Sequence, residues 1–284
     1  MLSLRERKYA YAEVMSMIDN VSCFGLEFNP FLKNSKQTIL EFDEFKEVRT
    51  RLDCLKDTHG FGLLTGSPGL GKTTALRTWT ASLNPSAYRV IYSCLSTITV
   101  LEFYRTLAQA FGQDPAYRKA DNFKLIQDAV TRLALEKRIT PVIIIDEANH
   151  ISTSILNDLK ILFNFEMDSK DRAIILLCGQ QQLNNTLSLN SQEALRQRLI
   201  MNYTMEGLTK EEGRAYIQAK LKGAGCRQDI FDEPAIEAIL NTAGGIPRMI
   251  NKLCNAALLI GNANSKNLID ADTAMQAIND TQLG

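Results

Sequence analysis

Short, fully apolar runs alternate with longer amphipathic runs over the first two thirds of the chain. Residues 142–145 and 174–178 are apolar at every position, which is typical of strands buried on both faces of a parallel sheet. Between such runs, apolar residues recur every three or four positions, as in residues 42–58 and 152–165, and this is the period of a helix. The alternation predicts an α/β domain.

Five runs of strand length are present, and we predict a five-stranded parallel sheet with the strand order 5-1-4-3-2. With this order the fourth strand lies next to the first, and the ends of both strands meet at one edge of the sheet. The five predicted strands are residues 61–64, 89–94, 142–145, 173–179 and 200–205.

From residue 207 onward the pattern changes to helices alone, separated by breaks that are rich in glycine. We therefore place a boundary near residue 206. Residues 1–206 are predicted to form the α/β domain with an N-terminal extension, and residues 207–284 a small all-helical lid domain. The predicted helices of this second domain are residues 208–221, 233–242, 248–260 and 270–278.

The composition mainly argues against certain classes of protein and site. The 284 residues carry 32 basic and 32 acidic side chains, so any binding to nucleic acid has to come from a local patch. Six cysteines without a CxxC pair and only two histidines argue for reduced core thiols and against a zinc site. The N-terminus is charged and no apolar run approaches the roughly 20 residues of a membrane span. We expect a cytoplasmic protein without a membrane partner.

A glycine-rich turn between the first strand and a helix carries the clearest chemistry. Gly66, four further residues, and then Gly71-Lys72-Thr73 match the phosphate-binding P-loop pattern. Glycines let backbone N–H groups point at a phosphate, and the start of the helix adds its positive dipole end. Lys72 would reach the β- and γ-phosphates, and the Thr73 hydroxyl would bind Mg²⁺. The predicted nucleotide-binding residues are Gly66, Ser67, Pro68, Gly69, Leu70, Gly71, Lys72, Thr73 and Thr74.

Two carboxylates follow the third strand, and a glutamine follows the fourth. Asp146 can hold the shell of Mg²⁺, and Glu147 beside it can polarise the water that attacks the γ-phosphate. Gln180 lies at the end of the strand predicted to neighbour the P-loop strand, where it can sense the phosphate. The alternative for Gln180 is an ordinary amide on a surface loop.

Together these segments resemble the AAA+ superfamily over residues 24–260. GSPGLGKTT resembles Walker A, VIIIDEANH Walker B, CGQ sensor 1, ALRQRL the arginine-finger segment and GGIPRMIN sensor 2. The finer resemblance is to the ExeA/MuB/TnsC-like branch, through FGLEFNPF, GLLTGSPGLGKTTALR, NDLKILFNFEMDS and LLCGQQQL. The resemblance implies a P-loop AAA+ fold that binds ATP and Mg²⁺ and hydrolyses the ATP.

The resemblance also suggests roles for three arginines and for the N-terminal lead-in. Arg196 or Arg198 is expected to be an arginine finger that completes the site of a neighbouring subunit, and the sequence does not say which. Arg248 begins a helix of the lid domain and can fold over the same phosphate. Residues 24–31 either cap the adenine pocket, which we expect, or merely pack as an N-terminal arm.

Two functions diverge within this branch. Secretion-type members are longer, with a membrane span and a wall-binding domain, and this sequence ends at Gly284 with neither. We therefore expect the transposition-helper type. That resemblance implies a homo-oligomer, a ring of six or seven subunits or a helical filament, that coats duplex DNA without sequence preference. It would recruit and activate a DDE transposase and disassemble on hydrolysis. The alternative is a secretion or envelope assembly ATPase, or a signalling NTPase, that does not act on DNA.

Candidate DNA contacts follow the second predicted strand. Residues 85–140 hold eight Lys or Arg against five Asp or Glu, an excess that a solvated face explains equally well. Thr99 is also expected to cap the next helix, with Glu102 as its capping-box partner. The candidates are Ser96, Thr97 and Thr99 as hydroxyl donors, with Arg105, Arg118, Lys119 and Lys124 as charges.

Overall fold

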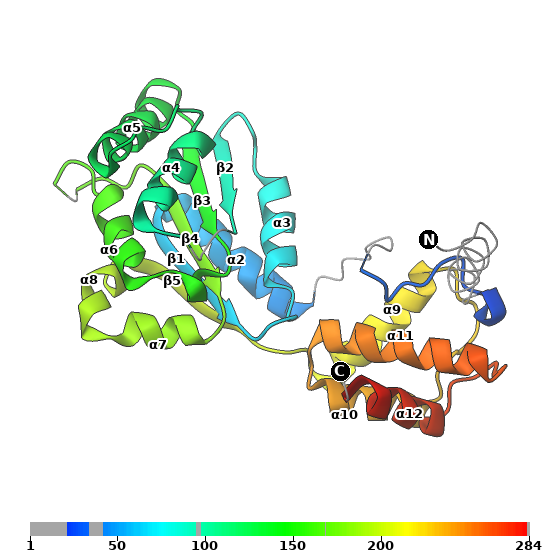
Figure 1. Ribbon diagram of the computed structural model, residues 1–284. Helices are drawn as coiled ribbons and strands as arrows, with labels where there is room; N and C mark the ends of the chain where they lie inside the picture. The colour runs from blue at the N-terminus through cyan, green and yellow to red at the C-terminus, as the bar shows by residue number, and fades with distance from the viewer. Residues whose placement is uncertain (1–21, 34–41, 95–97, 168, 283–284) are drawn as a thin grey trace, which may run out of the picture. The chain divides into compact units, whose positions relative to one another are not determined.

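The computed structural model describes residues 22–33, 42–94, 98–167 and 169–282. The chain divides into two compact units between Glu206 and Gly207 (Figure 1). Residues 43–206 form the first, which we call the α/β unit. Residues from 207 onward form the second, the helical unit, together with residues from the first 42. The predicted domain 1–206 had grouped these N-terminal residues with the α/β unit.

The α/β unit is built on one sheet of five parallel strands in the order β2-β3-β4-β1-β5 (Figure 1). This confirms the predicted order 5-1-4-3-2. The strands are β1 (Gly60–Gly66), β2 (Tyr88–Ser93), β3 (Thr140–Ile145), β4 (Ile174–Gly179) and β5 (Leu199–Met205).

Burial along the strands follows their place in the sheet. Every residue of β1 and β4 is buried, because each strand has a neighbour on both sides and helices over both faces. The edge strands β2 and β5 expose part of their residues. The helices of this unit are α2 (Asp43–Thr58), α3 (Lys72–Ser82), α4 (Val100–Ala110), α5 (Lys119–Thr131), α6 (Thr153–Leu162), α7 (Gln182–Ser188) and α8 (Glu193–Arg196), with short helical turns η2 (Arg132–Glu136), η3 (Ala148–His150) and η4 (Asn190–Gln192).

One face of the sheet packs against α4, α5 and α6 in a continuous apolar core. Alternate residues of each strand belong to this core, as expected from the two-residue period of a strand. Each fully buried large apolar side chain contributes about 1.5–3 kcal/mol through removal from water. The strand residues of this core include Phe61, Leu63, Ile143, Ile145, Ile175 and Leu177.

The helical unit has a separate core, and the N-terminal segment belongs to it. Phe24, Leu26 and Phe31 are buried in that core, and the ring of Phe31 meets Phe231 edge-on at 6.4 Å. Nζ of the buried Lys220 donates to the carbonyl of Pro30 at 2.7 Å. The helices of this unit are α9 (Lys210–Gly223), α10 (Glu233–Ala243), α11 (Pro247–Ala263) and α12 (Ala271–Gln282), with the turn η1 (Ser22–Phe24).

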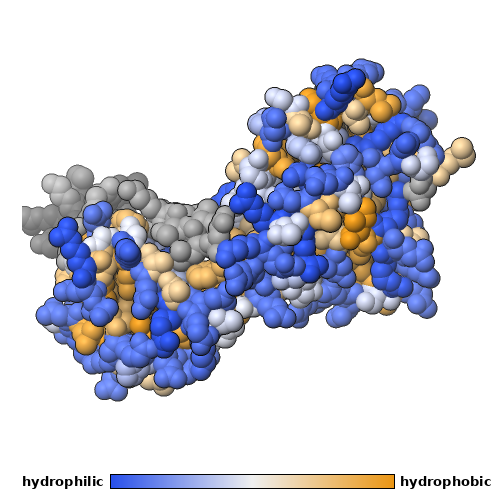
Figure 2. All heavy atoms as spheres, turned by 180° about the vertical axis from the view of Figure 1, so that it is seen from behind, coloured by the Kyte–Doolittle hydropathy of each residue, from blue (hydrophilic) through white to orange (hydrophobic). Residues whose placement is uncertain are grey.

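The surface is mixed in character. On the face seen from behind, Figure 2 shows mostly hydrophilic side chains, interrupted by small apolar groups. Single exposed apolar residues of this kind are ordinary on protein surfaces. Within the described residues, no helix combines the length and the apolar character that crossing a bilayer requires.

The predicted capping box at the start of α4 is confirmed. The hydroxyl of Thr99 accepts a hydrogen bond from the backbone N–H of Glu102 at 3.3 Å. The carboxylate of Glu102 accepts from the backbone N–H of Thr99 at 2.8 Å and from its hydroxyl at 2.7 Å. Two donors at the helix start are thus satisfied by one pair of side chains.

We predict that Thr99→Ala lowers the free energy of unfolding of the α/β unit by about 1 kcal/mol, because the cap is lost. The only tryptophan, Trp79, lies buried in α3 and reports unfolding of this unit in a denaturant titration followed by fluorescence. Thr209 makes the same capping box with Glu212 in the helical unit. Thr209→Ala is therefore the matched control and should leave the Trp79 transition in place. Equal shifts in both variants would contradict a local capping effect.

Candidate functional site

The P-loop lies between β1 and α3, and its backbone requires glycine. Gly66, Gly69 and Gly71 have φ angles of 154°, 89° and 103°, a region that other residues rarely adopt. A Cβ on Gly66 would stand 2.9 Å from the carbonyl oxygen of Met205. The glycines therefore allow a tight turn, and α3 begins directly after it, at Lys72. The first-turn N–H groups of a helix have no acceptor within it, so they are free to bind phosphate oxygens.

Lys72 is held inside this turn. Its side chain is 8% exposed, and Nζ donates to the carbonyls of Gly66 at 2.7 Å and Ser67 at 3.0 Å. These contacts fix the ammonium group beside the loop backbone. A cation held there, next to a helix N-terminus, favours the binding of negatively charged phosphate oxygens.

Asp146 directly follows β3, and hydrogen-bond donors from three directions surround its carboxylate. The hydroxyl of Thr73 donates to Oδ2 at 2.9 Å, and the hydroxyl of Tyr92 donates to the same oxygen at 2.8 Å. The backbone N–H of Glu147 donates to Oδ1 at 2.9 Å. Asp146 is only 4% exposed, so these donors replace most of the water that a free carboxylate would bind. The predicted pair Thr73 and Asp146 is thus brought together.

The donor set at this point fits a magnesium ion. A hydroxyl and a carboxylate are hard oxygen ligands, and they stand beside a lysine placed for phosphate. Thr73 and Asp146 would hold the ion. When bound, Mg²⁺ neutralises charge on the β- and γ-phosphates.

Glu147 follows in a left-handed conformation, with φ at 53°. Such a conformation costs about 1–3 kcal/mol for a residue other than glycine, and it is found preferentially at functional sites. The backbone reversal separates two neighbouring carboxylates: Asp146 is buried, whereas Glu147 is exposed. This arrangement leaves Glu147 free to orient a water molecule while Asp146 stays fixed.

The end of β4 is tied to the turn that carries Glu147. The backbone N–H of Gln180 donates to Oδ1 of Asn149 at 3.0 Å. The Gln180 side chain is half-buried, and its role as a phosphate sensor stays a prediction. A Cβ on Gly179 would stand 3.0 Å from the backbone nitrogen of Asn149, so a glycine allows this close approach. Sequence reasoning missed Asn149, although its place two residues after Glu147 was a usable signal.

A second group of residues missed by sequence reasoning supports the start of the P-loop. The hydroxyls of Thr65 on β1 and Thr204 on β5 lie 2.8 Å apart. Asn184 of α7 donates to both, at 3.0 and 3.3 Å. These contacts connect the residue before Gly66 to the neighbouring edge strand. No local sequence pattern indicates such a link, because its three members come from three separate elements.

The two arginines before β5 differ in their surroundings. Arg198 donates to the carbonyls of Lys160 at 2.5 Å and Phe163 at 3.3 Å, and its guanidinium lies 5.2 Å from the centre of the Phe61 ring. Arg196 is exposed and donates to the carbonyls of Leu187 and Ser188, each at 3.1 Å. Arg198 is therefore integrated into the packing of the α/β unit, whereas Arg196 is held at its surface.

Arg248 lies in the helical unit, in the first turn of α11, and it is exposed. Pro247 before it begins the helix, a position that proline favours. The expected contact between Arg248 and the phosphate stays a prediction.

The candidate DNA contacts fall into different environments. Ser96 and Thr97 lie outside the described residues. The hydroxyl of Thr99 is engaged in the capping box. Lys124 is exposed between Asp121 and Asp128, three positions before and four after it on α5, so its charge is largely offset.

The other three cations gather where α4 connects to α5. Arg105 donates to the carbonyls of Ala116 and Tyr117, and its guanidinium lies 5.9 Å from the Tyr117 ring centre. Arg118 is exposed at the N-cap of α5. Lys119 is half-exposed and pairs with Asp158 at 2.7 Å. We call Arg105, Tyr117, Arg118 and Lys119 the basic cluster.

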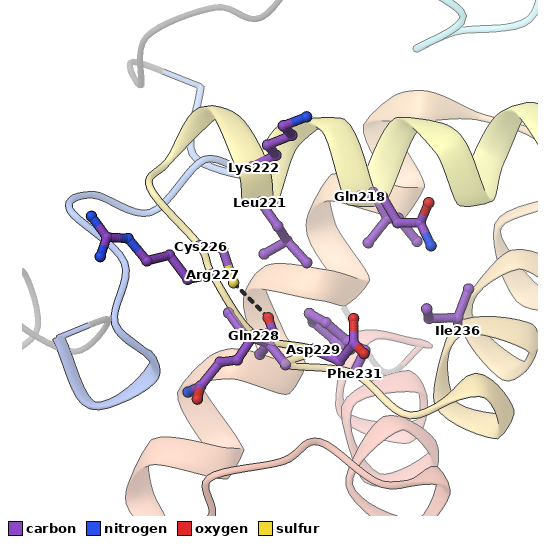
Figure 3. Close-up of a pocket in the computed structure, with 11 residues that line it drawn as sticks. Gln218, Leu221, Lys222, Cys226, Arg227, Gln228, Asp229, Phe231 and Ile236 are labelled. Carbon is purple, nitrogen blue, oxygen red and sulfur yellow. Dashed lines mark hydrogen bonds between the residues drawn. The ribbon is translucent and has the colours of Figure 1, made fainter.

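The helical unit contains a pocket of about 360 Å³ (Figure 3). In this view Gln218, Leu221 and Lys222 come from α9, and the thiol of Cys226 donates to the carbonyl of Gln228 at 2.8 Å. None of the predicted site residues lines this pocket, which belongs to the helical unit alone.

Known proteins resemble this chain in sequence and in fold. Residues 55–187 match a family model described as an AAA domain. General secretion pathway protein A from Aeromonas hydrophila is 32% identical over 262 residues. That alignment covers 89% of this chain and 47% of the relative, so the chain spans about half the length of the relative.

Solved structures share the fold. Cdc6p from Pyrobaculum aerophilum superposes with a TM-score of 0.65 at 16% identity, covering 84% of this chain and 67% of the other. The Aeropyrum pernix ORC1 protein in complex with DNA gives 0.63 at 15% identity, covering 89% and 68%. The RuvB Holliday junction branch migration motor of Thermotoga maritima gives 0.52 at 19% identity, covering 85% and 70%. The sheet order, the P-loop and these matches show an AAA-family P-loop ATPase domain.

We predict that Glu147→Gln retains nucleotide but loses turnover by at least about 100-fold, because the amide cannot act as the general base. Binding of a fluorescent ATP analogue and steady-state phosphate release measure the two properties separately. Glu136→Gln, at an exposed position of η2, is the control for loss of one carboxylate. An unimpaired rate in Glu147→Gln would remove this residue as the catalytic group.

Proposed function

We propose that this AAA-family P-loop ATPase domain uses ATP binding to assemble copies of the chain on duplex DNA and that the assembly serves a DDE transposase. Hydrolysis then releases the assembly. The observation that carries the DNA part is the basic cluster, which lies on the same rigid unit as the hydrolytic site. The transposase as client rests on the resemblance of the sequence to transposition helpers.

The basic cluster has the chemistry of a surface for phosphate backbones. Tyr117 is 84% exposed, an unusual environment for a large aromatic ring, and Arg105 packs beside it. Arg118, at the position after Tyr117, adds an exposed cation. Cations and hydrogen-bond donors that touch phosphates bind DNA of any sequence, because the backbone repeats.

The arginine environments favour one finger residue. Arg198 already donates to two carbonyls of the α6 end and packs over Phe61, so it stabilises its own subunit. Arg196 is exposed, and it donates to the backbone carbonyls of Leu187 and Ser188 at the end of α7. We assign Arg196 as the residue that reaches the nucleotide of a neighbouring copy.

A second candidate function is a secretion or envelope assembly ATPase. The observation that favours it is the 32% identity with General secretion pathway protein A. That alignment leaves more than half of the relative unmatched, so activities that depend on its remainder do not follow for this chain. The two candidates differ in whether duplex DNA is a ligand.

We expect the wild-type chain to bind unrelated duplex DNA sequences with similar affinity when a non-hydrolysable ATP analogue is present, and weakly with ADP. Fluorescence anisotropy measures binding, and electron microscopy shows whether rings or filaments form. The affinity should fall steeply as salt rises, because phosphate contacts release counterions. Lys72→Ala is the control that cannot respond to nucleotide. Absence of DNA binding at low salt, with the analogue bound, would exclude this function and favour the second candidate.

We expect Arg196→Ala to lower ATP turnover of the assembled protein by about 1,000-fold or more, without loss of stability, because the finger acts on a neighbouring site. Arg198→Ala should instead lower the free energy of unfolding. Phosphate release in the presence of DNA and denaturation followed by Trp79 fluorescence separate the two effects. The opposite pattern, with turnover lost only in a fully stable Arg198→Ala, would reverse the assignment.

A further inference from the structure

Tyr92 connects the outer edge of the sheet to the site. It lies on the edge strand β2, and its side chain is 51% exposed. Its hydroxyl nevertheless reaches inward and donates to Oδ2 of Asp146 at 2.8 Å. Because Tyr92 is half exposed, water could satisfy its hydroxyl without the hydrogen bond to Asp146. The contact therefore matters more to the buried Asp146 than to Tyr92.

The backbone fixes the geometry of this contact. Strands β2 and β3 pair in parallel, with Tyr92 opposite Ile144 and Ser93 opposite Ile145. One residue further, the backbone N–H of Asp146 donates to the carbonyl of Ser93 at 2.8 Å. The ladder thus continues up to Asp146 itself, and the Tyr92 hydroxyl reaches the carboxylate from a strand whose register is set.

Oδ2 is the Asp146 oxygen that meets the hydroxyl of Thr73, the other residue that would hold the ion. It accepts from both Tyr92 and Thr73, whereas Oδ1 accepts from the backbone of Glu147. A carboxylate fixed at both oxygens has one orientation about its terminal bond. Without the Tyr92 hydroxyl, Thr73 would be the remaining hydrogen-bond donor to Oδ2 in this set. The hydroxyl oxygen of Thr73 is itself a predicted ligand of the ion.

The Tyr92 hydroxyl is a dependable donor. Burial of the hydroxyl end and the hydrogen bond to Asp146 raise the pKa of Tyr92 well above its ordinary value. In this contact the hydroxyl is the donor, because an ionised carboxylate can only accept.

We propose that Tyr92 is a positioning residue that orients Asp146 and thereby sets the affinity of the site for the magnesium ion that accompanies nucleotide. The residues that would hold the ion are Thr73 and Asp146. Tyr92 would not touch the ion but would act through its hydrogen bond to Asp146, as groups that hydrogen-bond to ligating carboxylates commonly do. This inference rests on the P-loop ATPase domain and not on the DNA-binding function.

The test removes the hydroxyl of Tyr92 and keeps its aromatic ring. Tyr92→Phe should raise the free Mg²⁺ concentration needed for half-maximal binding of a fluorescent, non-hydrolysable ATP analogue by about 10-fold. Nucleotide binding in excess chelator should stay unchanged, because Lys72 and the loop backbone are intact. In turnover assays the half-saturating Mg²⁺ concentration should rise, while the rate at saturating Mg²⁺ stays near that of the wild type. Binding of Mn²⁺, followed by its electron paramagnetic resonance signal, gives an independent measure of the same change.

Tyr203→Phe is the matched control. The hydroxyl of Tyr203 donates to the Glu44 carboxylate at 3.0 Å from the opposite edge strand, β5, and burial together with that carboxylate raises its pKa to about 12. Its removal should leave the Mg²⁺ requirement unchanged. An unchanged or lower Mg²⁺ requirement in Tyr92→Phe would overturn the proposal. So would an equal rise in Tyr203→Phe, or weaker nucleotide binding by Tyr92→Phe in excess chelator. None of these measurements needs DNA, so failure here and failure of the DNA-binding function are distinguishable.

Discussion

The site depends on one hydrogen bond between distant parts of the chain, from the Thr73 hydroxyl to the Asp146 carboxylate. It forms only if β1 and β3 end at the same edge of the sheet, and β4 lies between them to set that alignment. The fully buried strands supply the rigidity, because a shift of register would expose apolar side chains. The interior of the sheet thus fixes the distance between the P-loop and the carboxylate.

The neighbouring carboxylates of Asp146 and Glu147 differ in their environment, because Asp146 is buried and Glu147 is exposed. The hydrogen-bond donors to Asp146 are the hydroxyls of Thr73 and Tyr92 and the backbone N–H of Glu147. These hydrogen bonds stabilise the ionised carboxylate of Asp146, which can then bind a cation. The pKa of the nearby Cys178 thiol is raised by burial and by the adjacent Asp146. Glu147 is turned away by its left-handed backbone and stays in contact with water. One strand end therefore carries a fixed, buried carboxylate and an exposed one, which is the arrangement that the predicted roles of metal ligand and general base require.

Much of this could be predicted from sequence, because the P-loop and the strand that ends in Asp146-Glu147 encode their chemistry in contiguous residues. The apolar runs located the strands, and the predicted strand order is that of the fold that the sequence resembles. The contribution of Tyr92 was not predictable, since it depends on which strand pairs with β3 and on where that pairing stops. The N-terminal segment was grouped with the wrong unit for a similar reason. Its partners, Lys220 and Phe231, come about 190 residues or more later.

In the proposed function, nucleotide state controls assembly on DNA, and the lifetime of the DNA complex tests this control most directly. Complexes formed with ATP on labelled duplex DNA are challenged with excess unlabelled DNA, and dissociation is followed by anisotropy. If hydrolysis by Glu147 triggers release, Glu147→Gln complexes should persist about 100-fold longer than those of the wild type in ATP. The two proteins should behave alike with a non-hydrolysable analogue. Equal lifetimes in ATP would contradict the account, because release would then be independent of hydrolysis.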